Sequence, residues 1–375
     1  MFPHLYIHIP FCASKCRYCG FYSVVAEADA LAAYPDALAR ELVQTDNYPS
    51  LHVQTVYMGG GSPSALGAEG LSRVAGRVGE SFPLGEAEEW TVELNPSGVT
   101  PGLLGALRRM GANRVSMGVQ SFCDGTLRRI GRGHSAEDAA RSVRLAQEHG
   151  FGNVGIDLIA GLPGVSEEEW RGTLGRALSL DVTHVSVYAL SVEDGTPLAR
   201  QVAAGECALP GDEAQLDALA VAEEALTGAG FRRYEISNYA RPGFECRHNL
   251  GVWRGNDYLG LGPSAASRIG QWRWTNPPRL ADYLETVKRE RLDAREDAVE
   301  RVMFMLRLDE GFDPFAAAAR YPVLGPLADG WEQRLEGLAR QGVVERGGAR
   351  WRLTARGREV CDAVVREVFL GRMTG

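Results

Sequence analysis

Two kinds of hydrophobic pattern alternate along the first 230 residues of the chain, namely short apolar β-rich runs and longer segments with helical spacing. The runs predict six strands: Leu5–Ile9, Thr55–Met58, Trp90–Leu94, Arg114–Gly118, Asn153–Leu158 and His184–Ala189. The spacing predicts six helices between and after them: Ala28–Leu42, Ala68–Val78, Pro101–Met110, Ala136–His149, Glu167–Ser179 and Glu213–Thr227. Repeated strand-then-helix units with short connections indicate an α/β fold with a parallel sheet. Six units are fewer than the eight of a closed barrel, so we expect a partial (β/α)6 barrel with an open side.

Local signals support the predicted helix ends. Thr100 is a candidate N-cap directly before Pro101, a residue favoured in the first helical turn. Gly150 is a candidate C-terminal stop for the helix before it. Pro35 is expected to start or kink the first helix.

The pattern changes after about residue 230. A strand-like segment, Phe231–Tyr239, is followed by a Gly/Trp-rich stretch, Pro242–Asn276. Helices are predicted at Leu280–Glu290, Glu296–Leu308, Trp331–Arg340 and Ala355–Phe369. Before the last helix, Val343–Leu353 is predicted to form a hairpin that turns at Gly347-Gly348. Helices followed by a two-stranded wing resemble a winged-helix unit, of α+β type. We therefore expect a barrel over residues 1–230, a connecting segment over 231–295 and a winged-helix-like domain over 296–375.

Composition narrows the class of protein. The chain has 375 residues, of which 45% are hydrophobic and 23% charged, as is ordinary for a soluble protein. A net charge of −8 argues against a general role in nucleic-acid binding. No apolar run approaches the roughly 20 residues of a membrane-spanning helix, which leaves peripheral association as the expected form of any membrane contact. The first strand begins at the N-terminus and the cysteines are scattered outside one loop, so we expect a cytoplasmic protein.

Polar or glycine features follow each predicted strand of the barrel. Ligands bind at the carboxyl ends of strands in such folds, so these features are expected to form one polar rim over an apolar interior. In chain order they are the cysteine loop, Gly59-Gly60-Gly61-Ser62, Glu93 with Asn95, Gln120 with Arg132, Asp157 with Gly161–Gly164, and Ser191. The glycine run suits either a plain turn or a close backbone approach to a ligand.

The cysteine loop holds the strongest chemical signal. Cys12, Cys16 and Cys19 lie within eight residues, and Lys15 and Arg17 beside them are expected to lower the pKa values of the thiols. A zinc site of this spacing normally has a second pair of ligands, which the rest of the chain does not offer. Disulfide bonding does not suit a chain of this kind. The residues favour an iron–sulfur cluster with one position left for another ligand and leave zinc as the alternative.

These residues carry a resemblance to a known family. The Cys-x3-Cys-x-Tyr-Cys loop after a Tyr-x-His-x-Pro strand resembles the radical S-adenosylmethionine (SAM) superfamily. Within it, the chain is similar to the branch that contains oxygen-independent coproporphyrinogen III oxidase and the HemW-type heme chaperones. The resemblance implies a [4Fe-4S] cluster on the three cysteines, with SAM on the fourth iron. It also implies SAM contacts at Tyr6, Tyr18, Gly60, Gly61, Ser62, Glu93, Gln120, Arg132 and Asp157.

Two positions distinguish the members of this branch. The oxidase carries a further cysteine where this chain has Phe21. The segment Cys246–Trp253 resembles the His-Asn-x-x-Tyr-Trp motif of the chaperones, with Val252 in place of tyrosine, and Ala266 stands where many members have histidine. By this resemblance His248 is the expected heme ligand, and Cys246 is the alternative. From residue type alone, a structural His–Asn hairpin explains the segment equally well.

The resemblance therefore implies a heme chaperone that carries a [4Fe-4S] cluster, SAM and heme. Its expected partners are apo-hemoproteins that receive the heme and an electron donor that reduces the cluster. The alternatives are the oxidase, which decarboxylates coproporphyrinogen III by radical chemistry, and a radical SAM enzyme with another substrate. Whether the protein is an enzyme stays open at this level.

Overall fold

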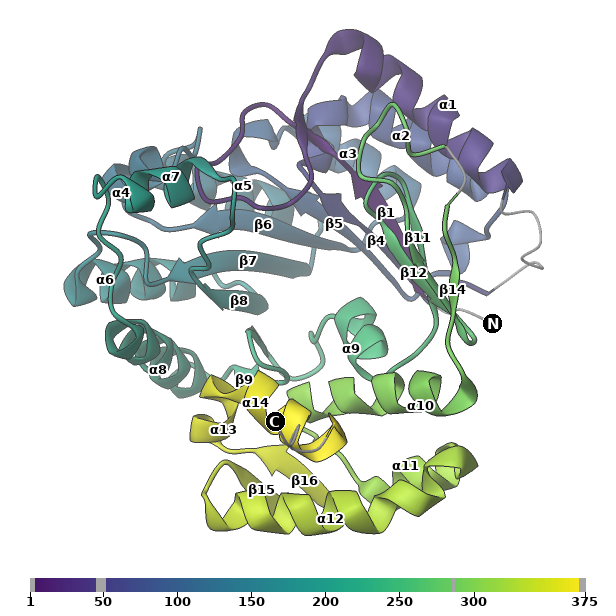
Figure 1. Ribbon diagram of the computed structural model, residues 1–375. Coiled ribbons are helices and arrows are strands. Elements are labelled where there is room, and N and C mark those ends of the chain that lie inside the picture. Colours follow the sequence, from purple (N-terminus) through teal and green to yellow (C-terminus); the bar gives the residue numbers. More distant parts are fainter. Residues whose placement is uncertain (1–3, 45–51, 285–286, 371–375) are drawn as a thin grey trace.

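A partial barrel of parallel strands forms the larger part of the molecule. The computed structural model describes residues 4–44, 52–284 and 287–370, and within them twelve strands join one sheet. The six predicted strands lie side by side in chain order, and they are β1 (His4–Ile9), β4 (Thr55–Gly60), β5 (Glu89–Leu94), β6 (Arg114–Gln120), β7 (Asn153–Ala160) and β8 (His184–Ala189). All neighbouring pairs among them are parallel, and the sheet does not close on itself (Figure 1). The expected α/β partial barrel is confirmed.

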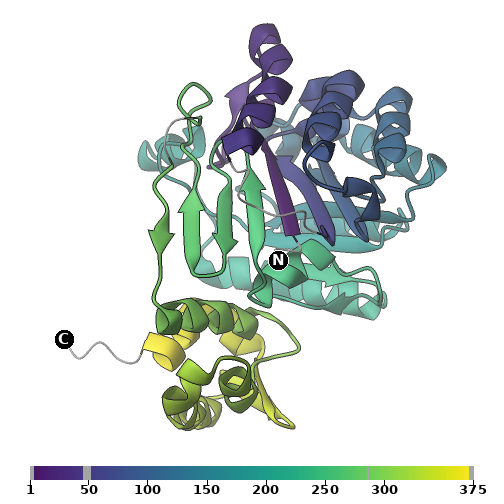
Figure 2. The same ribbon diagram turned by 90° about the vertical axis from the view of Figure 1, so that its right-hand side faces the viewer.

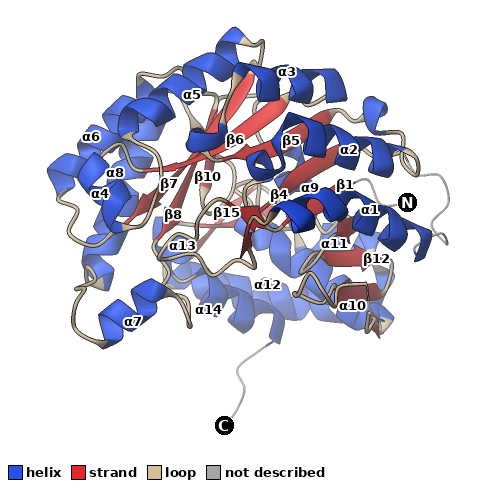
Figure 3. Ribbon diagram, turned by 90° about the horizontal axis from the view of Figure 1, so that it is seen from above, coloured by secondary structure: helices blue, strands red, loops and turns tan. Residues whose placement is uncertain are grey.

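Helices cover the outer face of this sheet. Viewed from above, they surround the strands on the convex side (Figure 3). The helices of the barrel are α1 (Ala28–Gln44), α2 (Gly67–Gly79), α3 (Pro101–Met110), α4 (Asp124–Arg129), α5 (Ala136–Glu148), α6 (Glu167–Leu178), α7 (Pro197–Ala203) and α8 (Asp212–Gly228). Each of the six predicted helices has its counterpart among them.

The helix ends form as their residue types predict. Thr100 caps α3 by accepting a hydrogen bond of 3.2 Å from the amide of Leu103. Gly150 has a φ of 81°, the left-handed conformation that stops a helix. Pro35 lies inside α1 instead of starting it. The carbonyl four residues before a proline loses its helical partner, a cost that the buried neighbours Tyr34 and Leu38 offset.

The strands of the barrel alternate between an apolar outer face and a polar inner face. Val56, Val92 and Val115 point outward and are fully buried under the helices. The side chains between them in sequence point into the barrel, and most are polar: His4, Tyr6, His8, Thr55, Tyr57, Glu89, Thr91, Glu93, Arg114, Ser116, Asp157, His184 and Ser186. The expectation of an apolar interior is wrong, because most hydrophobic β-branched residues of these strands face outward, although Ile159 of β7 lines the cavity.

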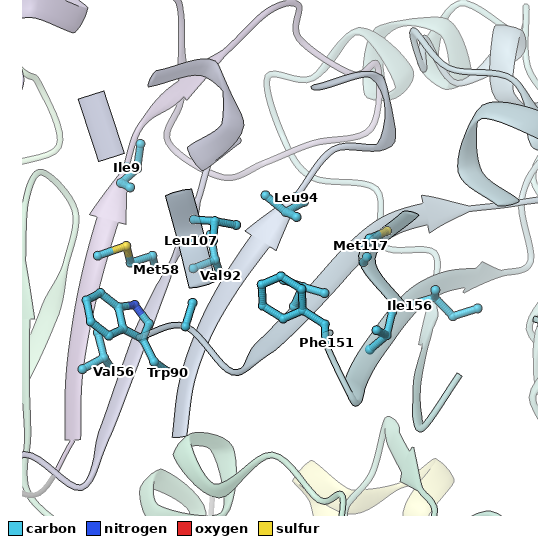
Figure 4. Close-up of a cluster of buried hydrophobic side chains, with 14 of the residues drawn as sticks. Ile9, Val56, Met58, Trp90, Val92, Leu94, Leu107, Met117, Phe151 and Ile156 are labelled. Carbon is cyan, nitrogen blue, oxygen red and sulfur yellow. The ribbon is translucent and has the colours of Figure 1, made fainter. Parts of the chain in front are cut away.

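The outer face forms the main hydrophobic core. Figure 4 shows Val56, Met58, Trp90 and Val92 packed beside Leu107 of α3. A second core lies in the C-terminal part, where Trp331 and Phe369 pack with ring centroids 5.1 Å apart. The two cores draw their buried residues from different parts of the chain, the first from residues before 280 and the second from residues after 290.

The segment after α8 extends the sheet at both ends. Next to β8 it adds β10 (Asn238–Ala240) and β9 (Arg232–Arg233), both antiparallel. At the other end, β11 (Tyr258–Leu261) pairs with β1 in parallel, and β12 (Ala266–Ile269), β13 (Trp272–Thr275) and β14 (Glu290–Arg291) follow antiparallel. Figure 2 shows these strands beside β1, with the C-terminal helices below. The residues predicted as a connecting segment thus supply strands to both edges.

A helical unit with a two-stranded wing completes the described chain. It consists of α10 (Ala294–Met303), α11 (Pro314–Arg320), α12 (Gly325–Arg340), β15 (Val344–Gly347), β16 (Arg350–Leu353), α13 (Ala355–Glu359) and α14 (Cys361–Val365), ending in a π-helical turn at Arg366–Leu370. The predicted hairpin at Gly347-Gly348 is confirmed. Buried ion pairs tie this unit to the sheet, since Arg268 of β12 contacts Asp297 of α10 at 2.8 Å.

Three predicted elements after residue 230 are wrong. Phe231–Tyr239 is not one strand but the two short strands β9 and β10. Leu280–Glu290 is not a helix, because its described residues form a turn after Pro277-Pro278 and then the edge strand β14, while residues 285–286 lie outside the described part. Ala355–Phe369 is broken at Val360, a β-branched residue with a φ of −119° between α13 and α14.

Candidate cofactor site

One cavity of about 640 Å³ opens at the carboxyl ends of the strands and extends down the inner face of the barrel. It brings together predicted residues from six separate segments of the chain. Its lining includes Tyr6, Cys12, Cys16, Tyr18, Cys19, Gly60, Gly61, Ser62, Glu93, Gln120, Arg132 and Asp157. Asn95 and Ser191 of the predicted rim also line it, whereas Gly161–Gly164 and the candidate heme ligands His248 and Cys246 do not.

The cysteine loop is fixed at its two ends and in its middle. Strands β2 (Phe11–Cys12) and β3 (Val24–Val25) pair with each other and close the loop. In the middle, the amide of Arg17 donates a hydrogen bond of 3.0 Å to the carbonyl of Ile130, and its carbonyl accepts one of 2.8 Å from Leu198 at the start of α7. The backbone is therefore held from three sides while the thiols face the cavity.

Arg132 is the cation that lies against the thiols. Its Nη1 donates to Cys16 Sγ at 3.3 Å, and its Nη2 donates to the Gly118 carbonyl. Burial raises the pKa of Cys12 and that of Cys19, and the charge of Arg132 only partly opposes this. Lys15 lowers the pKa of Cys19, as expected, but burial is the larger effect, so the pKa values of both thiols are raised overall.

The donor set suits a cluster better than a single ion. Within residues 4–44, 52–284 and 287–370, no three His, Cys, Asp or Glu side chains converge as ligands of one metal ion. A [4Fe-4S] cluster takes one thiolate per iron, so its cysteines stand apart around a common centre. Three cysteines that share a cavity without meeting at one point, next to a guanidinium, match that requirement.

The glycine turn after β4 exists because two strands approach closely there. A Cβ added to Gly61 would lie 2.7 Å from the carbonyl oxygen of Ile9, and one added to Gly60 would lie 2.4 Å from the ring of His8. The amides of this turn already donate hydrogen bonds, that of Gly60 to the Glu93 carboxylate and those of Gly61 and Ser62 to the carbonyls of Ile9 and Phe11. The turn can therefore offer a ligand open space and carbonyl oxygens, which suit an ammonium group better than a carboxylate.

Two carboxylates lie on the inner wall below the glycine turn. Glu93 accepts hydrogen bonds from Tyr57 Oη at 2.7 Å and from the Gly60 amide at 3.1 Å. Burial raises the pKa of Glu93 to about 7. Burial also raises the pKa of Asp157, which accepts a hydrogen bond of 3.3 Å from Ser116 Oγ. A cationic ligand beside these two groups would favour their ionised forms, which are strong hydrogen-bond acceptors.

Gln120 and Arg132 complete the rim above β6. Gln120 has a φ of 69° at a register shift between β6 and β7, so the strand bends where its side chain enters the cavity. A Cβ on Gly118 would lie 3.1 Å from Gln120 Nε2 and 3.3 Å from Arg132 Nη2. The absence of a side chain at Gly118 is therefore what lets both groups sit over this strand.

Comparison with known proteins agrees with this geometry. The model of the Radical SAM superfamily matches residues 6–177. The chain is 37% identical to the heme chaperone HemW of Mycobacterium tuberculosis (strain CDC 1551 / Oshkosh) over 97% of its own length and 94% of that protein. It is 32% identical to the heme chaperone HemW of Bacillus subtilis (strain 168) over 98% and 99% of the two chains.

The chain belongs to the HemW family of the radical SAM superfamily. Among solved structures, it resembles coproporphyrinogen III oxidase (HemN) from Escherichia coli, described as a radical SAM enzyme, with a TM-score of 0.84 and 27% identity over 98% of this chain and 90% of that one. Membership of the superfamily implies a [4Fe-4S] cluster and SAM. The expected family and fold are both confirmed.

The HemW-like His-Asn motif forms the short helix α9 (Arg247–Trp253), not a hairpin. The helix packs at the amino ends of β1 and β4, opposite the cysteines, and the His248 ring lies 5.1 Å from that of Tyr57. His248 Nδ1 is 2.9 Å from Thr55 Oγ1, and only 6% of the residue is exposed. Burial, with a smaller effect of His4 and Arg114, lowers the pKa of His248 to about 3.

The neighbours of His248 in this HemW-family chain are also engaged. Cys246 is fully buried with its thiol 3.5 Å from Glu89 Oε1, and burial raises its pKa to about 12. The two guanidiniums of this segment have carboxylate partners, since Arg247 pairs with Glu88 and Arg254 with Glu310. Both candidate ligands of this motif are therefore buried and in contact with polar groups of the fold.

Sequence reasoning missed the polar residues in the strand bodies. Tyr57, Arg114, Ser116, His184 and Ser186 line the same cavity as the predicted residues. The signal was present in the chain, because in each strand these residues occur at every second position between apolar ones. Reading the strands as continuous apolar runs hid that alternation.

Proposed function

We propose that the protein is a heme chaperone that binds a [4Fe-4S] cluster through Cys12, Cys16 and Cys19, binds SAM in the cavity, and transfers heme to apo-hemoproteins. The observation that carries the proposal is similarity over nearly the whole chain to proteins named heme chaperones, together with three thiols on one cavity. Phe21, 71% exposed at the mouth of the cavity, stands where the oxidase branch has a cysteine.

The residues of the cavity can each be given a role toward SAM. The glycine turn accepts the ammonium group, and Arg132 and Gln120 hold the carboxylate end. Glu93 and Asp157 accept hydrogen bonds from the ribose and ammonium groups, while Tyr6 and Tyr18 form the walls. A bound and reduced cluster supplies the electron for SAM cleavage, so the protein requires an electron donor as a partner.

The heme step needs a conformational change in this chain. His248 becomes available as a ligand only when α9 leaves β1 and β4 and gives up the contact with Thr55. In the part of the chain that the structure describes, no helix has both the length and the apolar character of a membrane span.

A heme titration of the anaerobically reconstituted protein tests the proposal. We expect a saturable Soret change in the wild type that His248→Ala removes. His4→Ala is the matched control, because its ring also bonds Thr55 Oγ1, at 2.8 Å, but lies outside the motif. Absence of a saturable Soret change in the wild type contradicts the heme proposal, and a change lost only in Cys246→Ala moves the ligand to Cys246. Transfer is then followed with apomyoglobin as the acceptor.

The oxidase activity is the second candidate, favoured by the TM-score of 0.84 with HemN from E. coli. Its test is an anaerobic assay with coproporphyrinogen III, SAM and a reductant. We expect no protoporphyrinogen above the background of Cys16→Ser. Sustained product formation would replace the chaperone proposal by the enzyme, and heme-free turnover of another substrate would favour a different radical SAM enzyme.

A further inference from the structure

The lower end of the cavity contains a point on which three polar side chains converge. Ser116, Gly155 and His184 are in register across β6, β7 and β8, and all three face into the barrel. Gly155 lacks a side chain, so its neighbours come close together over this position. A Cβ built there would lie 3.1 Å from Ser116 Oγ, 3.3 Å from Arg114 Nη2 and 3.4 Å from His184 Nδ1. Arg114, Ser116 and His184 also line the cavity, so their polar groups meet at its floor.

Arg114 is a buried cation without an ion pair. It is only 2% exposed, and within the described parts of the chain no carboxylate lies within 4.0 Å of its guanidinium. Nη1 donates to Thr91 Oγ1 at 3.3 Å, and Nε has no partner. Burial opposes the charge of Arg114, and Glu89 acts on it only from beyond contact distance, so an anionic ligand beside the guanidinium would stabilise it.

His184 brings a ring nitrogen without a partner to the same point. Its Nε2 lies 2.8 Å from Tyr234 Oη, which also accepts a hydrogen bond of 3.4 Å from the amide of Cys246. With the tyrosine hydroxyl as the donor to Nε2, the imidazole proton is on Nδ1, which is buried and has no partner. Burial lowers the pKa of His184 well below its usual value, so the ring is neutral.

We infer that Arg114 and His184, brought together over Gly155, form a carboxylate-binding subsite at the floor of the cavity, at the end opposite the cysteines. A guanidinium and an imidazole N–H can each hold one oxygen of a carboxylate, and Ser116 can donate a third hydrogen bond. The subsite takes the acidic arm of an organic ligand that fills the barrel below SAM. This inference does not depend on heme being that ligand.

Propionate is the probe that tests the subsite without heme. The full-length protein is labelled with ring-15N histidine, and the His184 signal among the seven histidines is assigned by its loss in His184→Gln. Titration with sodium propionate should shift the Nδ1 resonance of His184 saturably, in the millimolar range expected for so small a ligand. No saturable shift in the wild type overturns the inference.

Two variants test which groups carry the binding. Arg114→Met removes the charge, and Gly155→Ala places a methyl group against Ser116, Arg114 and His184 without removing any of their polar groups. Each should weaken propionate binding by about tenfold or more. Gly152→Ala is the matched control, since a Cβ there meets nothing within 4 Å, and it should bind as the wild type does. If Arg114→Met fails to fold, Gly155→Ala decides, and unchanged binding in that variant overturns the inference.

Metal-free porphyrins, which need no axial ligand, show whether the subsite binds the carboxylate of a porphyrin or that of another organic acid. Fluorescence titrations compare protoporphyrin IX with its dimethyl ester in the wild type and in Gly155→Ala. A porphyrin carboxylate predicts that the substitution weakens only the free acid. If neither porphyrin binds while propionate still shifts His184, the subsite serves another organic acid and the heme proposal fails by itself. Equal weakening of acid and ester contradicts carboxylate recognition.

Discussion

The two faces of the barrel sheet differ although they come from the same short strands. On the outer face, Val56, Val92 and Val115 are fully buried against helices. On the inner face, Tyr57, Glu93 and Ser116 alternate with them and face a cavity. Burial of apolar area accounts for the outer face. The inner face instead buries carboxylates and a guanidinium, groups that oppose folding unless they are paired.

The difference indicates that the outer face specifies the fold and the inner face specifies the ligands. Substitutions should therefore separate into two classes. Changes on the outer face should lower the free energy of unfolding and leave cofactor binding intact in the folded molecules. Changes on the inner face and its rim should weaken cofactor binding without lowering the free energy of unfolding.

The largest effect is expected at the rim of the inner face. Cys16→Ser should reduce the iron and sulfide content after anaerobic reconstitution from about four of each per chain to near zero, because the cluster loses a ligand. The melting temperature without cofactors should change little, since Cys16 contributes no core packing. Cys123→Ser is the control, as this thiol bonds Glu169 at 2.9 Å outside the cavity. Zinc in place of iron in the wild type contradicts the cluster assignment.

The next effect concerns Asp157 on the inner wall. Asp157→Asn should weaken SAM binding by about tenfold to a hundredfold, the range for losing a hydrogen bond to a charged group. Because burial raises the pKa of Asp157, its ionised form opposes folding, and the variant without ligand should melt at a higher temperature at neutral pH. Calorimetry gives both quantities. If the variant melts at a lower temperature and binds SAM as the wild type does, Asp157 stabilises the fold and does not bind SAM.

A smaller effect is expected in the pH dependence of stability. Burial raises the pKa of Glu93 to about 7 in the folded protein, compared with about 4.3 in an unfolded chain. Its contribution is therefore fully present below about pH 4 and is lost as the pH rises through 7. The free energy of unfolding without ligands should fall between about pH 5 and about pH 8.

Glu93→Gln should reduce that fall by up to about 3 kcal/mol, an upper value because the side chain borders the cavity. Denaturant unfolding at the two pH values measures it. Glu41 provides the internal comparison, since burial also raises its pKa to about 7. Its carboxylate accepts a hydrogen bond of 2.8 Å from the Gly262 amide, and it does not line the cavity. The contribution of Glu41 to the pH dependence should persist in Glu93→Gln. If the free energy of unfolding depends on pH in this variant as it does in the wild type, Glu93 does not contribute to that dependence.

These contrasts also explain what the chain alone could predict. The order of strands and helices followed from local periodicity, and the cysteine loop followed from spacing, as did the cap at Thr100. The residues after 230 were harder, because β11 joins β1 only through contacts more than 250 residues apart in sequence. Pairing of that kind depends on long-range packing that local patterns do not encode.

The functional residues divide in the same way. Tyr6, Glu93, Gln120, Arg132 and Asp157 were assigned by resemblance to a family, and the fold brings them to one cavity. The resemblance also selected His248, but nothing in the motif indicated that α9 would bury it against Thr55. Arg114 and His184 were missed because no motif marks them, and only the register of three neighbouring strands places them together.

The sharpest comparison uses two adjacent residues of β6 that face opposite sides. Val115→Ala removes two buried carbon atoms from the outer core and should lower the free energy of unfolding by about 2 kcal/mol without changing SAM affinity. Ser116→Ala should change that free energy by less than about 1 kcal/mol, yet weaken SAM binding severalfold, because Asp157 loses the hydrogen bond from Ser116. Denaturant unfolding and calorimetric titration of both variants, with the wild type beside them, measure the four quantities. Because the two positions share one strand, a change in backbone geometry would affect both variants alike. If Ser116→Ala proves the more destabilising of the two, or if Val115→Ala loses SAM affinity while still folded, the division between a folding face and a binding face is wrong.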